Sequence, residues 1–155
     1  MPRISRRVYQ NAIVRILNSF GFETKEIALA KLLALRKTKI MYIDVAGKNF
    51  PYFGRNGQRV FLWETHIKPD RLDKIERAAN KYGGEPWLAF SYWILDVEVE
   101  HEFSTIVTIK DKKFGAKFIK TSDYRKHMQP RSPSWSEIEL PRRIVTQITL
   151  DPEQL

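Results

Sequence analysis

The sequence predicts an α/β fold in which a mixed β-sheet is flanked by helices. Amphipathic helical patterns and β-rich runs follow one another along the chain. The run over residues 87–94 shows little alternation between polar and apolar side chains, which is typical of a central strand covered on both faces. Helices and strands in this order predict helices packed on a sheet.

Three helices are expected. Apolar residues recur at helical spacing over residues 5–20, where Ser5 suits the N-cap and Gly21 ends the helix. A second helix is expected from Pro69 to about Tyr82, because proline suits the first turn and two glycines follow. A short helix is expected at 122–127. Residues 26–37 have high helix propensity, but a helix and part of the sheet both remain open for them.

The expected strands pair as hairpins. Residues 40–46 and 59–66 are β-rich and are joined through the turn signal at 54–57. A second hairpin is expected from residues 105–110 and 116–120, which turn around 112–115. Residues 143–150 are predicted to form a final edge strand.

Composition limits the class of protein. A length of 155 residues suits one domain, expected over 1–155, with a motif-bearing core at 1–95 and C-terminal strands with a short helix at 96–155. The absence of cysteine excludes disulfides, thiolate metal sites and cysteine nucleophiles. No apolar stretch is long enough to span a membrane, and no apolar signal core follows the N-terminus. The expected location is the cytoplasm, with no membrane partner.

The formal net charge of +9 points to nucleic acid or an anionic surface as partner. Basic residues gather in an N-terminal arm, before the run at 40–46, and late in the chain. Such groups suit contacts to phosphates, which position a protein on DNA without reading its sequence. The candidate DNA-binding residues are Arg3, Arg6, Arg7, Arg36, Lys37, Lys39, Arg125, Lys126 and Arg131.

Two acidic residues carry most of the catalytic character. Asp44 lies in the first β-rich run and Glu64 in the second, so a hairpin could bring both carboxylates to one end of the sheet. Carboxylate oxygens bind Mg²⁺, and the metal ion activates water and offsets phosphate charge. His66 and Lys68 share the face of Glu64 if the strand runs that far, and could orient the water. Asp44 and Glu64 are therefore candidate metal ligands.

These motifs resemble the PD-(D/E)xK nucleases, in which an Asp on one strand precedes Glu-x-Lys on the next. The wider order resembles archaeal Holliday-junction resolvases: Gly21-Phe22 after the first helix, Ile43-Asp44-Val45, a second helix, then Gly83-Gly84-Glu85-Pro86 before an apolar strand. The resemblance covers roughly residues 8–93. It implies a restriction-endonuclease-like fold, a DNA substrate, Mg²⁺ (or Mn²⁺) as cofactor, and a homodimer, since two equivalent cuts in a branched DNA need two active sites.

The chain departs from this family at two positions. His66 stands where the family carries Lys, and Gln10 stands at or near a catalytic Glu of the first helix. The first hypothesis is a metal-dependent DNA endonuclease, acting on branched or specific DNA, in which His66 or Lys68 assists the water and Gln10 lies in the outer shell. The alternative is a catalytically inactive nucleic-acid-binding protein on the same fold.

Overall fold

The computed structural model describes residues 4–53, 56, 59–60, 63–131, 133 and 135–155. The strands of the main sheet are β1 (Glu23–Ala28), β2 (Lys31–Arg36), β3 (Lys39–Phe50), β6 (Glu85–Ile94), β7 (Val107–Ile109) and β8 (Lys112–Lys120). Two small sheets pair β4 (Tyr52–Phe53) with β5 (Arg59–Val60), and β9 (Gln129–Pro130) with β10 (Ile138–Glu139). The helices are α1 (Arg6–Ser19), α2 (Pro69–Tyr82), α3 (Thr121–His127) and α4 (Val145–Ile148), with 3₁₀ turns η1 (Val97–Glu102) and η2 (Pro152–Gln154).

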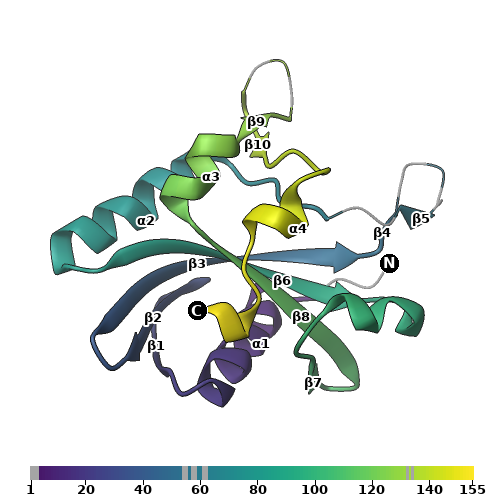
Figure 1. Cartoon of the computed structure of the whole chain (residues 1–155), viewed down its shortest axis with the longest axis horizontal. Helices are drawn as coiled ribbons and strands as arrows, with labels where there is room; N and C mark the ends of the chain where they lie inside the picture. Colours follow the sequence, from purple (N-terminus) through teal and green to yellow (C-terminus); the bar gives the residue numbers. More distant parts are fainter. Residues whose placement is uncertain (1–3, 54–55, 57–58, 61–62, 132, 134) are drawn as a thin grey trace.

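The main sheet is mixed and has the order β1-β2-β3-β6-β8-β7 (Figure 1). β1, β2 and β3 form an antiparallel meander, and α2 then carries the chain back so that β6 pairs parallel to β3. β8 and β7 complete the sheet in antiparallel order. The predicted mixed α/β fold, with helices flanking a mixed sheet, is confirmed.

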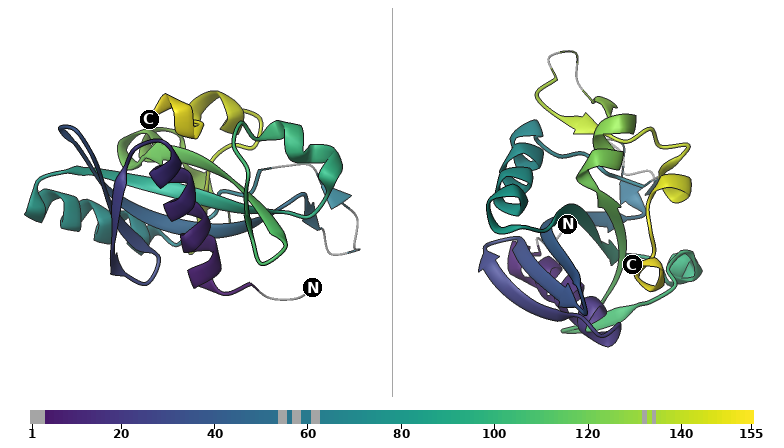
Figure 2. Two further views of the ribbon diagram at one scale, coloured as in Figure 1. Left: turned by 90° about the horizontal axis from the view of Figure 1, so that it is seen from below. Right: turned by 60° about the vertical axis from the view of Figure 1, so that its left-hand side comes forward.

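Helices cover both faces of this sheet (Figure 2). On one face, Ile13 and Leu17 of α1 belong to a buried cluster with Ile43 of β3. On the other face, Leu72 of α2 and Tyr124 of α3 join a second buried cluster. Because side chains alternate along a strand, the neighbours of Ile43 in the sequence face α2. The sheet therefore directs Asp44 toward the α2 side.

The three predicted helices and the central strand are confirmed: α1, α2 and α3 form where expected, and β6 lies in the interior of the sheet. Ser5 is the N-cap of α1, and its hydroxyl accepts a hydrogen bond from Val8 N at 3.4 Å. Residues 26–37, which had been open, form the β1-β2 hairpin. Leu32 and Ala34 alternate into the core, and pairing with β3 outweighs the local helix propensity.

The prediction that residues 59–66 form a strand of the main sheet is wrong. Within the part of the chain that the structure describes, Arg59–Val60 pairs with Tyr52–Phe53 and with no strand of the main sheet, and residues 63–66 have no regular structure. This apolar segment lies against the sheet, where Trp63 and Ile67 enter the buried cluster of the α2 face. Tyrosine hydroxyls replace a strand partner: Tyr92 and Tyr124 donate to the carbonyls of residues 64 and 65, each at 2.8 Å. Most of the predicted turn at 54–57 lies outside the described residues.

Two further predictions need correction. Residues 143–150 do not form an edge strand, because Val145–Ile148 is helical and only Leu150 makes an isolated bridge, to Phe118. The β7-β8 hairpin turns at Lys110 and Asp111, two residues before the expected turn, and both have positive φ (49° and 66°). Among the described residues, no helix combines the length and apolar character needed to cross a membrane.

Gly115 offers a test of the packing between β8 and the η1 segment. A Cβ at this position would collide with the ring of Phe103. That ring contacts Phe50, Trp63 and Tyr92, so it has little room to move. We expect Gly115→Ala to lower the free energy of unfolding by about 1–3 kcal/mol, measured by urea denaturation. In a Phe103→Leu background the same change should cost less, and an equal loss in both backgrounds would show that the ring is not the cause.

Candidate nucleic-acid interface

Asp44 is buried on the α2 face of β3 and is held by an arginine. The residue is 2% exposed, and Arg71 of α2 binds its side chain through two hydrogen bonds, Nε to Oδ2 at 2.7 Å and Nη2 to Oδ1 at 3.0 Å. The same Nη2 donates to the carbonyl of Val45 at 2.7 Å. A buried carboxylate needs such a partner, since an unpaired charge is costly inside a protein. The pair joins α2 to the centre of the sheet.

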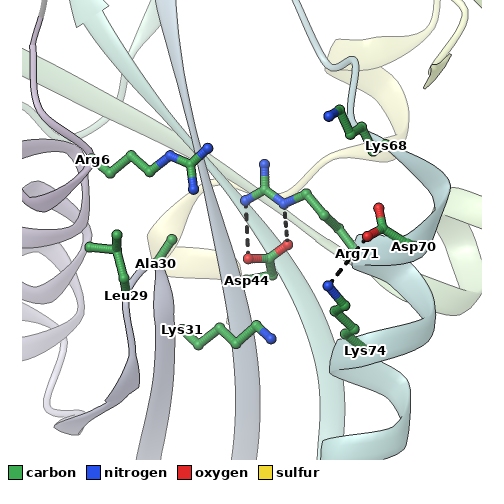
Figure 3. Close-up of a pocket in the computed structure, with 9 residues that line it drawn as sticks. All are labelled: Arg6, Leu29, Ala30, Lys31, Asp44, Lys68, Asp70, Arg71 and Lys74. Carbon is green, nitrogen blue, oxygen red and sulfur yellow. Dashed lines mark hydrogen bonds and ion pairs between the residues drawn. The ribbon is translucent and has the colours of Figure 1, made fainter. Parts of the chain in front are cut away.

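A cavity of about 240 Å³ surrounds this pair (Figure 3). It is lined by cationic side chains from three elements: Arg6 from α1, Lys31 from β2, and Lys68, Arg71 and Lys74 at the start of α2. The only carboxylates in the lining, among the described residues, are Asp44 and Asp70. Five cations against two acids give the cavity a positive charge. The Asp44 carboxylate already accepts two hydrogen bonds from Arg71.

Glu64 lies at a second site, on the irregular segment before α2. It is 4% exposed, and its Oε2 accepts from Nδ1 of His66 at 2.7 Å. Arg142 contacts its other oxygen at 3.3 Å, and Arg131 lies 3.8 Å from Oε2. Burial alone would raise the pKa of Glu64, but the His66 hydrogen bond and these cationic neighbours lower it below its usual value. Glu64 is therefore an ionised carboxylate whose negative charge is balanced by the cationic side chains around it.

Lys48 lies beside this network. Its Nζ donates to the carbonyl of His66 at 2.6 Å, and with Glu64 and His66 it lines another cavity of about 240 Å³. Burial, and after it the nearby charge of Arg71, lower the pKa of Lys48 to about 7, although the charge of Glu64 acts in the opposite direction. An amine that titrates near neutral pH can hold or release a proton under physiological conditions.

A third cavity connects these two sites. It shares Arg6 and Arg71 with the Asp44 cavity, and Tyr9 and Gly47 with the Glu64 cavity. The three form a groove with Asp44 at one end and Glu64 at the other. The ring of Tyr9 lies directly on Gly47, where a Cβ would collide with it. We call this feature the basic groove.

Gln10 supports the groove from within the core. It is 2% exposed, and its Oε1 accepts from the backbone N of Ala30 at 2.7 Å. Ala30 occupies the β1-β2 turn with φ of 65°, and its carbonyl accepts from Val45 N at 2.7 Å. Gln10 thus ties α1 to the turn that presents Lys31.

The predicted DNA-binding residues have diverse surroundings. Arg6 lines the basic groove, while Arg3 lies outside the described residues. Several have protein partners: Arg7 pairs with Glu26, Arg36 donates to the carbonyls of Phe20 and Leu155, Lys39 lies over Trp87, Arg125 pairs with Asp73 and Glu76, and Arg131 pairs with Glu137. Lys37 and Lys126 are exposed, on a turn and on α3.

The donor set does not suit a divalent metal ion. Within the described part of the chain, no three His, Cys, Asp or Glu side chains come together as a cluster that could hold one. Asp44 and Glu64 line different cavities, and each is bound by arginine. The two residues predicted to assist the water also lie at different cavities. Lys68 is exposed at the N-cap of α2 and lines the Asp44 cavity, whereas His66 contacts Glu64.

Sequence reasoning did not select several groove residues. Arg71, Lys74, Arg142 and Lys48 were not among the candidate site residues selected from the sequence. Their position in the groove depends on the extension of β3 to Phe50 and on the return of the C-terminal segment. One sequence signal was available for Arg71: it lies two residues after Pro69, so the first turn of α2 carries it.

Comparison with known proteins supports the fold assignment. No protein-family model matches the chain, and no curated protein sequence matches it. Among solved structures, the fold is similar to that of Hjc, a Holliday junction resolvase from the archaeal hyperthermophile Archaeoglobus fulgidus. The match has a TM-score of 0.54 and covers 92% of this chain and 95% of the other, with 10% sequence identity. The chain therefore has the nuclease-like fold that its motif order had indicated.

The Asp44–Arg71 pair can be tested through stability. We expect Arg71→Ala to lower the free energy of unfolding by about 2–4 kcal/mol, since it leaves a buried carboxylate unpaired while the partial exposure of Arg71 moderates the cost. Arg77→Ala, an exposed arginine of the same helix, is the matched control and should change stability by less than about 0.5 kcal/mol. Chemical denaturation of both variants measures the difference, and equal losses would contradict the pairing.

Lys48 should make stability depend on pH. Its pKa is lower in the folded protein than in the unfolded chain, so between about pH 7 and the ordinary lysine value the unfolded state binds more protons. The contribution of Lys48 to stability therefore rises with pH across this window. We expect wild type to gain stability relative to Lys48→Met as pH rises from 7 to 10, measured by urea denaturation. A constant difference between the two proteins would show that the amine keeps its ordinary pKa.

Proposed function

We propose that this protein binds DNA, duplex or branched, by seating backbone phosphates along the basic groove. The observation that supports this best is the state of the two candidate catalytic carboxylates. Both are buried and bound by arginines, while the cavity around Asp44 is also lined by Arg6, Lys31 and Lys68, whose side chains have no partner among the described residues. Such a surface suits an anionic chain more than a divalent cation. The similarity to a Holliday junction resolvase makes branched DNA the first substrate to test.

Strand register supports the same proposal. β3 is the strand of the main sheet that leads to α2, so the family motif Glu-x-Lys could be matched to Asp44-Val45-Ala46 instead of Glu64-Thr65-His66. Lys31 then stands opposite Asp44 on the preceding strand, where the family signature places an Asp. In this match Lys31 stands where the family has its Asp, and Ala46 stands where the family has its Lys. Both changes remove chemistry that metal-dependent hydrolysis needs.

A second candidate is hydrolysis of branched DNA with Mg²⁺ or Mn²⁺. The fold similarity over nearly the whole of both chains favours it, as do the Glu64–His66 pair and the adjacent Lys48. This candidate requires the ion to compete with arginines for Asp44 and Glu64. Catalytic roles for His66, Lys68 and Gln10 belong to this candidate and stay predictions. A homodimer and a cytoplasmic location also stay predictions.

One experiment separates the two candidates. The full chain is incubated with a four-way junction, a duplex and a single strand, in EDTA, Mg²⁺ or Mn²⁺. We expect binding in EDTA without cleavage in either metal ion. Affinity should fall about a thousandfold between 50 and 200 mM salt if about six phosphates are contacted.

Two results would contradict this expectation. Cleavage that is lost in both Asp44→Ala and Glu64→Ala would establish the endonuclease. Weak DNA binding with no dependence on salt would reject the proposed contact with phosphates.

A further inference from the structure

Three cations converge on the Asp44 cavity without a partner. Within the described residues, Arg6, Lys31 and Lys68 form no hydrogen bond or ion pair through their side chains, although all three line this cavity. The other two cations are partnered, Arg71 with Asp44 and Lys74 with Asp70 at 3.3 Å. Unpaired like charges around one cavity repel one another, so their arrangement has an electrostatic cost that a bound anion would offset.

Arg71 is fixed in a position that leaves part of its donor capacity open. Its Nε and Nη2 bind Asp44 and the Val45 carbonyl, while Nη1 has no partner among the described residues. In Figure 3 the Arg6 guanidinium extends toward that of Arg71. Two guanidinium groups that face one cavity are well suited to a tetrahedral oxyanion, because each offers N–H donors in a planar fork.

We propose that the Asp44 cavity is a binding site for a single phosphate group, with no divalent cation, in which Asp44 positions Arg71 as a donor. The phosphate ligands would be Arg6, Lys31, Lys68 and Arg71. That the phosphate belongs to DNA rests on the proposed function, whereas the site itself does not. Asp44 would then serve the opposite of its expected role, since it holds a cationic ligand instead of a metal ion.

The shape and surroundings of the cavity agree with this assignment. Its volume of about 240 Å³ is several times the space of a water molecule. The N-terminus of α2, a helix of 14 residues whose N-cap Lys68 makes no side-chain capping bond, lies at its edge. A helix N-terminus carries partial positive charge and adds to the field of the lysines. Asp70 opposes this field, but Lys74 neutralises it.

The first test uses inorganic phosphate with the full chain in EDTA. Backbone and arginine side-chain NMR signals should shift saturably around residues 6, 31, 44 and 71. Lys31→Ala and Arg6→Ala should each weaken binding on the order of tenfold, since each removes a charged donor. Lys81→Ala is the matched control, because Lys81 lies at the far end of α2, about 20 Å from Lys68, and should leave affinity unchanged. Unsaturable shifts, or equal effects of all three changes, would overturn the site.

The second test separates this inference from the proposed function. Affinity for a DNA duplex and a four-way junction is measured with the same variants. A loss for Lys31→Ala and Arg6→Ala, but not for Lys81→Ala, supports both. DNA binding that is indifferent to these variants excludes the Asp44 cavity from the contact with DNA. If phosphate also fails to bind saturably in the first test, the phosphate site is rejected, while DNA binding through other residues stands. Saturable phosphate binding without DNA binding rejects the proposed function alone and supports a free phosphate or phosphorylated metabolite as ligand.

A third arm addresses the metal ion directly. Asp44→Asn removes the charge of the side chain but keeps an acceptor for Arg71. We expect phosphate affinity to be retained or increased in this variant, and Mg²⁺ to cause no saturable shift at Asp44 in wild type. Saturable Mg²⁺ binding that is lost in Asp44→Asn would identify a metal site and overturn the proposal. Circular dichroism of the variant checks that it is folded.

Discussion

The bidentate pair between Asp44 and Arg71 is the interaction on which the arrangement of the basic groove depends. Residues on β3 alternate between two covered faces, and this places a carboxylate in the interior of the protein. A buried charge is tolerated only when it is paired and hydrogen-bonded. Arg71 meets that need from the first turn of α2, so the pair fixes where this helix begins above the sheet. Lys68 and Lys74 reach the cavity as a consequence.

The irregular segment before α2, residues 63–68, shows a second constraint. Trp63 and Ile67 are buried there without lying in a strand of the main sheet, so the backbone of this segment must find other hydrogen-bond partners. The hydroxyls of Tyr92 and Tyr124 bind two of its carbonyls, and the hydroxyl of Thr65 accepts from Leu140 N at 2.9 Å. These contacts hold Glu64 and His66 at the end of the groove. They also bring the C-terminal segment, with Arg142, against the same carboxylate.

Such an arrangement separates fold from chemistry. The nuclease-like sheet and helices can be retained while the charges at the site change sign, because apolar clusters on the two faces of the sheet make up most of its buried core. Folds support many functions, so activity has to be inferred from the site. In this protein the site has two carboxylates that are paired with arginines, cationic side chains that line a cavity, and a lysine, Lys48, with a pKa near 7.

Much of the fold was predictable because local patterns and tertiary packing agree. Ser5, Pro69 and Gly83 mark helix ends by their own stereochemistry, and the run at 87–94 is apolar on both faces because both faces are covered. Residues 26–37 and 59–66 could not be settled in this way. In the first, pairing with β3 overrides helix propensity; in the second, residues 63–65 are buried against the sheet and do not form one of its strands.

The candidate site was predictable only in part, for a related reason. The sequence by itself determined the class of fold, the basic character of the chain, and the two acidic residues that needed partners, since these follow from composition and local periodicity. Only the tertiary structure decided which partners those acids have. Arg71 is 27 residues from Asp44, and Arg142 is 78 residues from Glu64. No local pattern encodes contacts of that range, because they depend on how α2 and the C-terminal segment return across the sheet.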